Sequence, residues 1–373
     1  MHNAQPWRFV YRPGSGFVEL HGDPERAMTR TDPNHRALHV GCAAALFNLR
    51  VSAVGHGLRT RVRLLPDGLQ PWLLAEVAID GSFDEDQDLA VLHDALRRRH
   101  TGRFPFSDEP VPDALMDGLR RAARLEGCRL SVPGEWHMGT VLDLVRGAEH
   151  REGIDPLVRA ETAAWAAPPQ APTGTRLDGI PATAFGPRSS GGASPVRDFG
   201  RDRPDPDRGW AVFEKRPQLA LLGTPTDTRV DWLRAGQALE RVLLQATADG
   251  LATSMTSQPL PRRPSGADPG RIPALLGACE PADPHCGASA GSVREGTAGR
   301  RTQVQWRGPA RFLGPCLHAY ALHRGHPPRG SGAGTASLVH APIAGLTATG
   351  PEGARLAGPG GPQRQGSAAR AAA

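Results

Sequence analysis

Apolar and polar positions near the start of the chain predict two β-hairpins separated by one long helix. The hairpins consist of short runs of β-favouring residues joined by turns that contain Gly and Pro. Their strands are predicted at residues 7–11, 17–21, 60–65 and 73–79. Between the hairpins, residues 36–54 repeat apolar side chains at three- and four-residue spacing, which predicts a helix that Gly55 and Gly57 end.

From about residue 84 onward, the pattern predicts a second block of helices and strands. The helices are expected at residues 88–99, 112–126, 135–149 and 231–249, and the strands at residues 128–132 and 219–222. Pro112 suits the first position of its helix, and Asp231 lies near a helix cap. Residues 166–209 contain many Pro, Gly, Ser and Arg with little periodicity, so they are predicted to form a long loop or lid.

An internal repeat relates two of these helices at an offset of 193 residues. Each copy is a long helix closed by Gly-Leu and followed directly by a strand. The coinciding residues are Ala45, Leu46, Ala53, Gly57, Leu58 and Thr60 in the first copy, and Ala238, Leu239, Ala246, Gly250, Leu251 and Thr253 in the second. Any two Ala- and Leu-rich helices that end in Gly resemble one another, so the repeat alone leaves both interpretations open.

Composition changes after residue 260. Residues 261–373 contain 20 Gly and 14 Pro, show no sustained periodicity and end in three Ala residues. We expect an unstructured segment that arose by a frameshift in a GC-rich gene. A genuine disordered tail is the alternative, although Trp306, Phe312 and Tyr320 fit it poorly.

The basic charge of the chain belongs to this last segment. The whole chain carries a net charge of +6, whereas residues 261–373 carry 13 Arg and only 5 acidic residues, a surplus of eight. Residues 1–260 are therefore slightly acidic. Lys215 is the only lysine, whereas nucleic-acid sites normally combine clustered Lys and Arg. No nucleic-acid partner is expected.

Cysteine usage and hydropathy favour a cytoplasmic protein that has no membrane partner. The five cysteines are scattered and include no CxxC pair, which argues against a disulfide framework or a zinc site. They are Cys42, Cys128, Cys279, Cys286 and Cys316. No apolar run approaches the roughly 18 residues that a membrane-spanning helix needs, and the first residues lack a signal peptide.

Three segments, taken in order, resemble the nitroreductase superfamily, and in particular its tandem, Acg-like members, in which one chain carries two nitroreductase-like halves. Residues 2–9 (HNAQPWRF) are similar to the family's Ser-x-x-Asn-x-Gln-Pro-Trp-x-Phe stretch. Residues 99–103 (RHTGR) are similar to the Arg-x-Ser-x-Arg/Lys opening of a nitroreductase unit. The helix that starts near Trp232 is similar to the family's long central helix, and together with the first helix it accounts for the repeat.

The resemblance implies a site for FMN. The Asn and Gln of the first motif would contact the polar edge of the flavin ring, and the second motif would hold the phosphate and a pyrimidine-side group. The paired N–H donors of an Arg guanidinium and a hydroxyl donor suit a phosphate group with two negative charges. The candidate cofactor-binding residues are Asn3, Gln5, Arg99, His100, Thr101 and Arg103. Hydride transfer through flavin N5 needs no protein nucleophile or base, so no catalytic residue is expected.

Each motif also has a purely structural interpretation. The first motif is compatible with a turn that leads into a strand, with Trp7 in the core. Residues 97–99 are compatible with cations that stabilise the end of a helix dipole. Because the two motifs lie in different predicted halves, they either converge on one flavin or form two incomplete half-sites, and the sequence leaves this open.

Both ends depart from the family pattern. A family unit begins with a helix and its Arg-x-Ser motif some tens of residues before the Asn-containing stretch, whereas here Asn3 almost directly follows Met1. We therefore expect that residues are missing at the N-terminus, through a start site assigned too late or a truncated gene. After residue 260 the family pattern continues with a short helix and a final apolar strand, which this sequence lacks.

The expected architecture is an α+β, nitroreductase-like fold in which two tandem half-units of a monomer mimic the family homodimer. The predicted boundaries are residues 1–83, 84–260 and 261–373. The implied function is FMN-dependent oxidoreduction, in which NAD(P)H delivers hydride through flavin N5 to a nitro, quinone or similar small-molecule acceptor. The alternatives are a flavin-binding or flavin-sequestering protein without turnover, and a non-functional truncated product.

Overall fold

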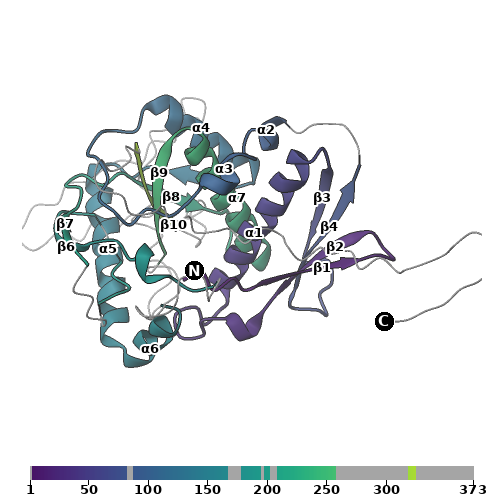
Figure 1. Cartoon of the computed structure of the whole chain (residues 1–373), viewed down its shortest axis with the longest axis horizontal. Coiled ribbons are helices and arrows are strands. Elements are labelled where there is room, and N and C mark those ends of the chain that lie inside the picture. Colours follow the sequence, from purple (N-terminus) through teal and green to yellow (C-terminus); the bar gives the residue numbers. More distant parts are fainter. Residues whose placement is uncertain are drawn as a thin grey trace, which may run out of the picture. The chain divides into compact units, whose positions relative to one another are not determined.

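The computed structural model describes residues 2–81, 87–166, 178–194, 197–201 and 208–257, and the backbone of residues 318–324 (Figure 1). In this part of the chain, helices and antiparallel strands form two four-stranded sheets. A two-stranded parallel sheet adds to them. The predicted α+β class is confirmed, whereas the division into two tandem half-units stays a prediction.

The first sheet consists of the two predicted hairpins. Its strands are β1 (Trp7–Arg12), β2 (Phe17–Gly22), β3 (Arg59–Leu64) and β4 (Leu73–Asp80), in the order β1-β2-β4-β3. All neighbours are antiparallel. One face buries Val18, Leu20, Leu74 and Val77 against helix α1 (Arg36–Gly55). Alternation along β2 therefore sets the face that packs on the helix.

Helices α1 and α7 (Arg229–Ala248) pack against each other and separate the two sheets (Figure 1). Their backbones come close at Gly236, where an added Cβ would lie 2.2 Å from the Val40 carbonyl oxygen. Each helix is followed by a glycine of positive φ, Gly57 at 72° and Gly250 at 77°, and then by a strand. The two helices that the repeat related thus end in the same way.

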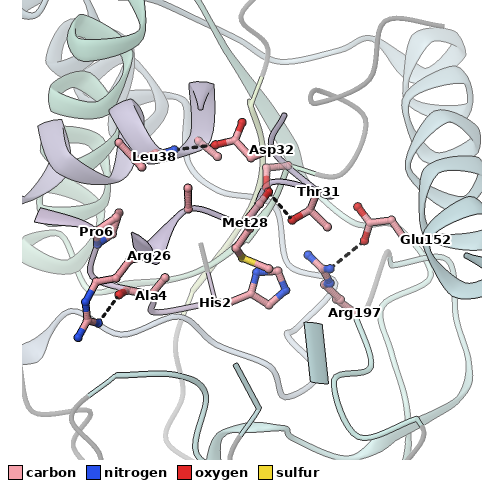
Figure 2. A pocket seen from close by; sticks show the side chains of 13 residues that line it. His2, Ala4, Pro6, Arg26, Met28, Thr31, Asp32, Leu38, Glu152 and Arg197 are labelled. Atoms are coloured by element: carbon pink, nitrogen blue, oxygen red, sulfur yellow. Dashed lines mark hydrogen bonds and ion pairs between the residues drawn. The ribbon is translucent and has the colours of Figure 1, made fainter. Parts of the chain in front are cut away.

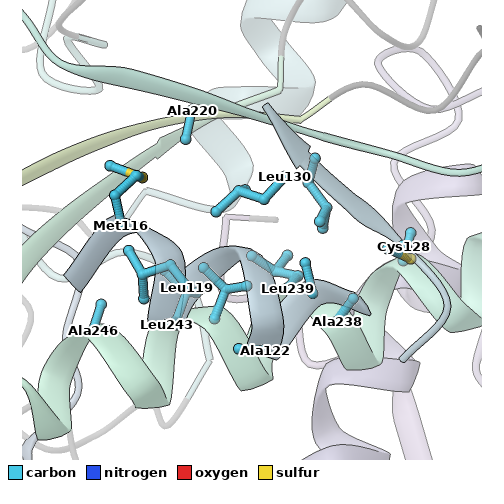
Figure 3. Close-up of a cluster of buried hydrophobic side chains, with 14 of the residues drawn as sticks. Met116, Leu119, Ala122, Cys128, Leu130, Ala220, Ala238, Leu239, Leu243 and Ala246 are labelled. Carbon is cyan, nitrogen blue, oxygen red and sulfur yellow. The ribbon is translucent and has the colours of Figure 1, made fainter. Parts of the chain in front are cut away.

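The second sheet packs on the other side of this helix pair. Its strands are β5 (Arg129–Ser131), β8 (Leu219–Gly223), β9 (Leu251–Thr256) and β10 (His318–Arg324), in the order β5-β8-β10-β9. Helix α4 (Asp113–Leu125) contributes Met116 and Leu119 to the cluster that fills the space between this sheet and α7 (Figure 3). Leu239 and Leu243 of α7 complete the contact.

Strand β10 lies in the segment that the sequence predicted to be unstructured. The segment after residue 260 was expected to be unstructured, yet His318–Arg324 pairs antiparallel with both β8 and β9. The prediction is wrong for these residues, because their backbone pairs with β8 on one side and with β9 on the other. The remainder of residues 258–373 lies outside the described residues.

A truncation experiment tests this pairing. A chain that ends after Ser257 is expected to be less soluble than one that ends after His340, because loss of β10 exposes the edges of β8 and β9. The midpoint of thermal unfolding should fall by roughly 4 °C or more. Equal soluble yields and equal midpoints for the two chains would show that β10 contributes nothing to the sheet.

The region between residues 87 and 99 also differs from the prediction of one helix. It forms two short helices, α2 (Gln87–Ala90) and α3 (Ala95–Arg98), joined by turns with hydrogen bonds from residue i+3 to residue i. Leu89, Leu92 and Ala95 are buried at three-residue intervals. This spacing suits three residues per turn and leaves Val91 in solvent, so a continuous α-helix does not form here.

Helix α5 (Glu135–Ile154) is longer than predicted, and α6 (Pro156–Ala164) was not predicted. Asp155 caps α6 by accepting hydrogen bonds from the backbone N–H groups of Leu157 and Val158. The region expected to be a loop or lid contains the strand β6 (Arg188–Gly191), which pairs in parallel with β7 (Trp210–Val212). Short 3₁₀ helices η1 (Pro24–Arg26) and η2 (Ala182–Ala184) complete the described elements.

Among the described residues, α1 alone is long and apolar enough to cross a membrane by length and composition. Most of the apolar window of α1 is buried inside the protein (72%), as in the core helix of a folded domain.

Candidate functional site

The N-terminal segment is held in an unusual backbone conformation by contacts on both sides. His2, Asn3 and Gln5 have φ values of 50°, 52° and 50°, a region that side chains other than glycine rarely adopt. Asn3 donates from Nδ2 to the carbonyl oxygen of Gly179 at 3.0 Å, and its own carbonyl accepts from Gly179 N at 2.9 Å. The predicted flavin-contacting amide is therefore bonded to the region expected to form a lid.

Arg99 is paired with a carboxylate of α7 in this structure. Its Nε lies 3.0 Å from Oε1 of Glu240 in α7, and the Arg99 side chain is only 16% exposed. His100 is exposed and its Nδ1 lies 3.1 Å from the carbonyl oxygen of Arg98. Thr101 forms a parallel bridge with Thr253 of β9. Arg99 thus lies against α7 and Thr101 at the edge of the second sheet, whereas His100 is exposed.

Arg103 is the residue of the second motif that lies near the first motif, because Arg103 and His2 both contact Phe199. Its Nη1 donates to the carbonyl oxygen of Ala184 at 2.9 Å, and its guanidinium lies 5.1 Å from the ring centre of Phe199. Burial, with a smaller contribution from nearby Arg197, lowers the pKa of Arg103 to about 10. The His2 ring contacts the same Phe199 edge-on at 5.2 Å.

Residues from the two predicted halves therefore converge on Phe199. The segment 178–186 binds both motifs, because Gly179 bonds to Asn3 and Ala184 accepts from Arg103. The Arg197 guanidinium also lies 4.8 Å from the Phe199 ring centre. This part of the predicted lid thus contacts two of the residues that the sequence assigned to a cofactor, Asn3 and Arg103.

A cavity of about 30 Å³ lies next to this junction (Figure 2). Its polar wall includes His2, Arg197 and Glu152 of α5, and Figure 2 shows the His2 ring and the Arg197 guanidinium facing each other. Arg197 donates from Nη2 to Oε2 of Glu152 at 2.8 Å. The opposite wall is mainly apolar and includes Pro6 and Leu38.

Burial dominates the electrostatics around the cavity. The pKa of His2 is lowered well below its ordinary value by burial, and then by positive charges that include Arg197 and Arg103. Burial also lowers the pKa of Arg197, an effect that Glu152 and Glu149 oppose. Burial raises the pKa of Glu149 despite the proximity of Arg201 and Arg197. His2 is therefore neutral near pH 7 and lies in a positive potential.

The described conformation does not fit a complete FMN. Pockets for ligands of this size usually enclose several hundred cubic ångströms, whereas this cavity has about 30 Å³. The Asn3 amide and the Arg103 guanidinium carry suitable donors, but both bond to the segment 178–186. Both donors become fully available to a flavin only when this segment releases them.

Sequence reasoning missed three residues of the junction, His2, Arg197 and Phe199. His2 belongs to the first motif, yet its position beside Asn3 gave no indication that the ring would be buried. Arg197 and Phe199 lie in a region without periodicity, and no local signal distinguishes them from neighbouring Arg and Phe residues.

Comparison with known proteins agrees with the resemblance. The nitroreductase family profile matches residues 96–278. "Putative NAD(P)H nitroreductase Rv3131" of Mycobacterium tuberculosis (strain H37Rv) is 30% identical over 271 residues, which cover 70% of this chain and 73% of the relative. "Putative NAD(P)H nitroreductase acg" of the same strain is 29% identical over 258 residues, 68% of this chain and 74% of the relative.

A third relative from that strain, "Uncharacterized protein Rv3127", is 28% identical over 257 residues, which cover 68% of this chain and 73% of its own length. The profile match includes the Arg99–Arg103 motif, α4, β8, α7 and β9, and thus most of the second sheet with its covering helices. By sequence similarity over more than two thirds of these relatives, and by its α+β architecture, the chain belongs to the nitroreductase family.

Proposed function

We propose that the chain is an FMN-dependent oxidoreductase of the nitroreductase type. It takes reducing equivalents from NAD(P)H and passes them to a nitro compound, a quinone or a similar small acceptor. Family membership and the relatives' printed name, NAD(P)H nitroreductase, support oxidoreductase chemistry. The two halves act within one chain in this proposal, and the packing of α1 against α7 supports such an internal pseudo-dimer.

The observation that carries the proposal is the convergence of the two motifs on one place. Asn3 from the first motif and Arg103 from the second both bond to the segment 178–186. If that one segment moves away, an amide and a guanidinium become available together, one for a polar ring edge and one for an anionic group. Two independent half-sites would have no reason to bond to the same segment.

Arg99 has a supporting role in this proposal. Because its guanidinium pairs with the buried Glu240, it holds the start of the second motif against α7 and positions Arg103. The chemistry of hydride transfer belongs to the cofactor once it is bound. The protein's share is to bind and orient it, and to exclude water.

A second candidate function is flavin binding without turnover. The observation that favours it is the contact that residues 178–186 make with both Asn3 and Arg103, together with the position of Phe199 against Arg103. A cover that closes over bound flavin would keep NAD(P)H and acceptors away. The two candidates differ only in whether the segment opens during a catalytic cycle.

Titration of the purified chain with FMN, followed by flavin fluorescence and by the flavin absorption band near about 450 nm, tests the proposal. The wild-type chain should bind FMN and oxidise NAD(P)H when a quinone or nitro acceptor is added. Arg103→Gln should weaken FMN binding by about tenfold or more, because it removes a charge-assisted donor. Arg61→Gln serves as the control, because Arg61 is 70% exposed on β3.

The outcomes separate the candidates. FMN binding together with NAD(P)H oxidation supports the oxidoreductase, and FMN binding without oxidation supports the second candidate. A folded chain that takes up no FMN contradicts both and favours a non-functional product. Phe199→Ala should accelerate FMN uptake if the cover must open, and an unchanged rate of uptake would argue against the cover.

A further inference from the structure

His39 of α1 is a buried histidine whose two ring nitrogens both have partners. The residue is 3% exposed. Its Nδ1 lies 2.6 Å from the carbonyl oxygen of His35, one turn earlier, and its Nε2 lies 3.2 Å from Nε of Arg229 in α7. A carbonyl oxygen accepts hydrogen bonds and an arginine N–H donates them. The neutral His39 ring therefore carries its proton on Nδ1 and accepts from Arg229 at Nε2.

This contact joins three elements of the fold. Arg229 is the first residue of α7, and its Nη2 also donates to the carbonyl oxygen of Pro71, shortly before β4. Trp72 and Trp232 flank the His39 ring, with ring centres 6.4 Å and 5.3 Å away. We call these five residues the His39 joint. It connects the first turn of α1, the first turn of α7 and the start of β4.

The charges around the joint oppose protonation of His39. Arg36 and Asp227 form an ion pair, so their charges offset each other. The structure gives Arg229 hydrogen bonds to His39 and Pro71, and no carboxylate partner within its described residues. Burial lowers the pKa of His39 to about 4; the bond to the His35 carbonyl opposes this effect, whereas the positive charge of Arg229 and the His35 ring add to it.

We propose that the His39 joint is an acid-sensitive contact between the two predicted halves, in which protonation of His39 breaks its bond with Arg229 and weakens the packing of α7 on α1. A protonated ring carries N–H groups on both nitrogens, so Nε2 can no longer accept and two cations face each other. Helix α1 belongs to the first predicted half and α7 to the second. The inference goes beyond the proposed function, since no cofactor takes part in it.

The direction of the effect follows from the two states of the chain. The pKa of an exposed histidine is about 6.5, whereas that of His39 in the folded chain is about 4. Above about pH 7 the ring is neutral in both states and the contact is complete. As the pH falls below about 6.5, the unfolded chain binds the proton first, and stability decreases until the pH reaches about 4. At about pH 5, His39 should raise the equilibrium constant of unfolding about thirtyfold.

Urea unfolding of the full chain at about pH 7.5 and about pH 5, followed by circular dichroism, tests the inference. His39→Gln keeps a donor and an acceptor but does not titrate. Between the two pH values, the unfolding constant of the wild-type chain should rise about thirtyfold more than that of this variant. His150→Gln is the control, because His150 is exposed on α5, and it should keep the wild-type pH dependence. Equal pH dependence in the wild-type chain and a folded His39→Gln variant overturns the inference.

NMR titration of the histidine rings measures the same group directly. The His39 signal is the one missing in His39→Gln, and in the wild-type chain it should shift only below about pH 5. Arg229→Gln removes the neighbouring positive charge and should raise the pKa of His39, while burial still keeps it below the ordinary value. A wild-type His39 signal that titrates near about pH 6.5 overturns the inference. So does a set of histidine titration curves that is the same in Arg229→Gln as in the wild-type chain, a result that can be read even if His39→Gln fails to fold.

Discussion

Replacement of Glu126 by alanine is expected to lower the free energy of unfolding by about 3–5 kcal/mol. Glu126 follows α4 and accepts hydrogen bonds from Arg50 of α1 and Arg241 of α7, each at 2.8 Å. Its side chain is 8% exposed and that of Arg241 is 7% exposed. One carboxylate therefore compensates two guanidinium groups where three helices meet, and its removal leaves both charges buried.

The measurement is urea-induced unfolding followed by circular dichroism. Glu126→Gln should cost less than the alanine variant, because the amide oxygen still accepts one hydrogen bond. Asp117→Ala provides a control on the same helix, since Asp117 is 71% exposed and pairs with Arg120. Loss of that surface pair should cost at most about 1 kcal/mol. Similar midpoints for the Glu126 and Asp117 variants would show that the buried network is not a source of stability.

Gly236→Ala is expected to destabilise the chain by about 1–3 kcal/mol or more. Gly236 lies where α7 crosses α1, and a Cβ there would approach the Val40 carbonyl oxygen to 2.2 Å and the Ala43 Cβ to 2.6 Å. Neither neighbour can move away easily, since one is backbone and the other a buried side chain. The clash outweighs the roughly 1 kcal/mol by which alanine favours a helix over glycine.

Gly118→Ala should have the opposite effect. Gly118 lies within α4 and an added Cβ there has nothing within 4 Å, so only the helix preference acts. The variant should gain about 0.5–1 kcal/mol. Thermal and urea unfolding of both variants measure this difference in sign. If Gly236→Ala also raises the stability, the close crossing of α1 and α7 is not present in solution.

The sequence predicts those parts of the fold in which periodicity directly reflects burial. Strand β2 and helix α4 each have one buried face, and α1 packs against both the first sheet and α7, so their apolar positions repeat with the expected spacing. Helix α6 was also accessible from the sequence, because Asp155 followed by Pro156 is a typical helix start.

Elements whose positions depend on distant partners were less predictable. Residues 87–98 form two short helices and not the single helix that was predicted, because Leu89 and Leu92 pack against Phe47 and Leu244. Strand β10 is short and follows a long Gly- and Pro-rich stretch, and its identity as a strand depends on β8 and β9. Local patterns carry little information about such pairings.

The same distinction applies to the candidate site. Motif resemblance selected Asn3 and Arg103, whose side chains bond to the same segment, 178–186. It did not reveal that Arg99 pairs with Glu240, because these residues are 141 positions apart and only the packing of α7 brings them together. Arg197 stayed unnoticed since its role depends on burial beside His2 and not on any neighbour in sequence.

The packing of α1 against α7 also determines when the protein can fold during synthesis. Helix α7 begins 193 residues after α1 begins. A ribosome that adds roughly 5–20 residues per second therefore needs roughly 10–40 s before the partner of α1 emerges. During that interval the apolar face that α1 later buries against Leu233 and its neighbours is exposed to water and to other nascent chains. Slow translation thus prolongs the exposure of this helix, and the yield of folded protein in cells should depend on elongation rate and on chaperones that bind apolar helices.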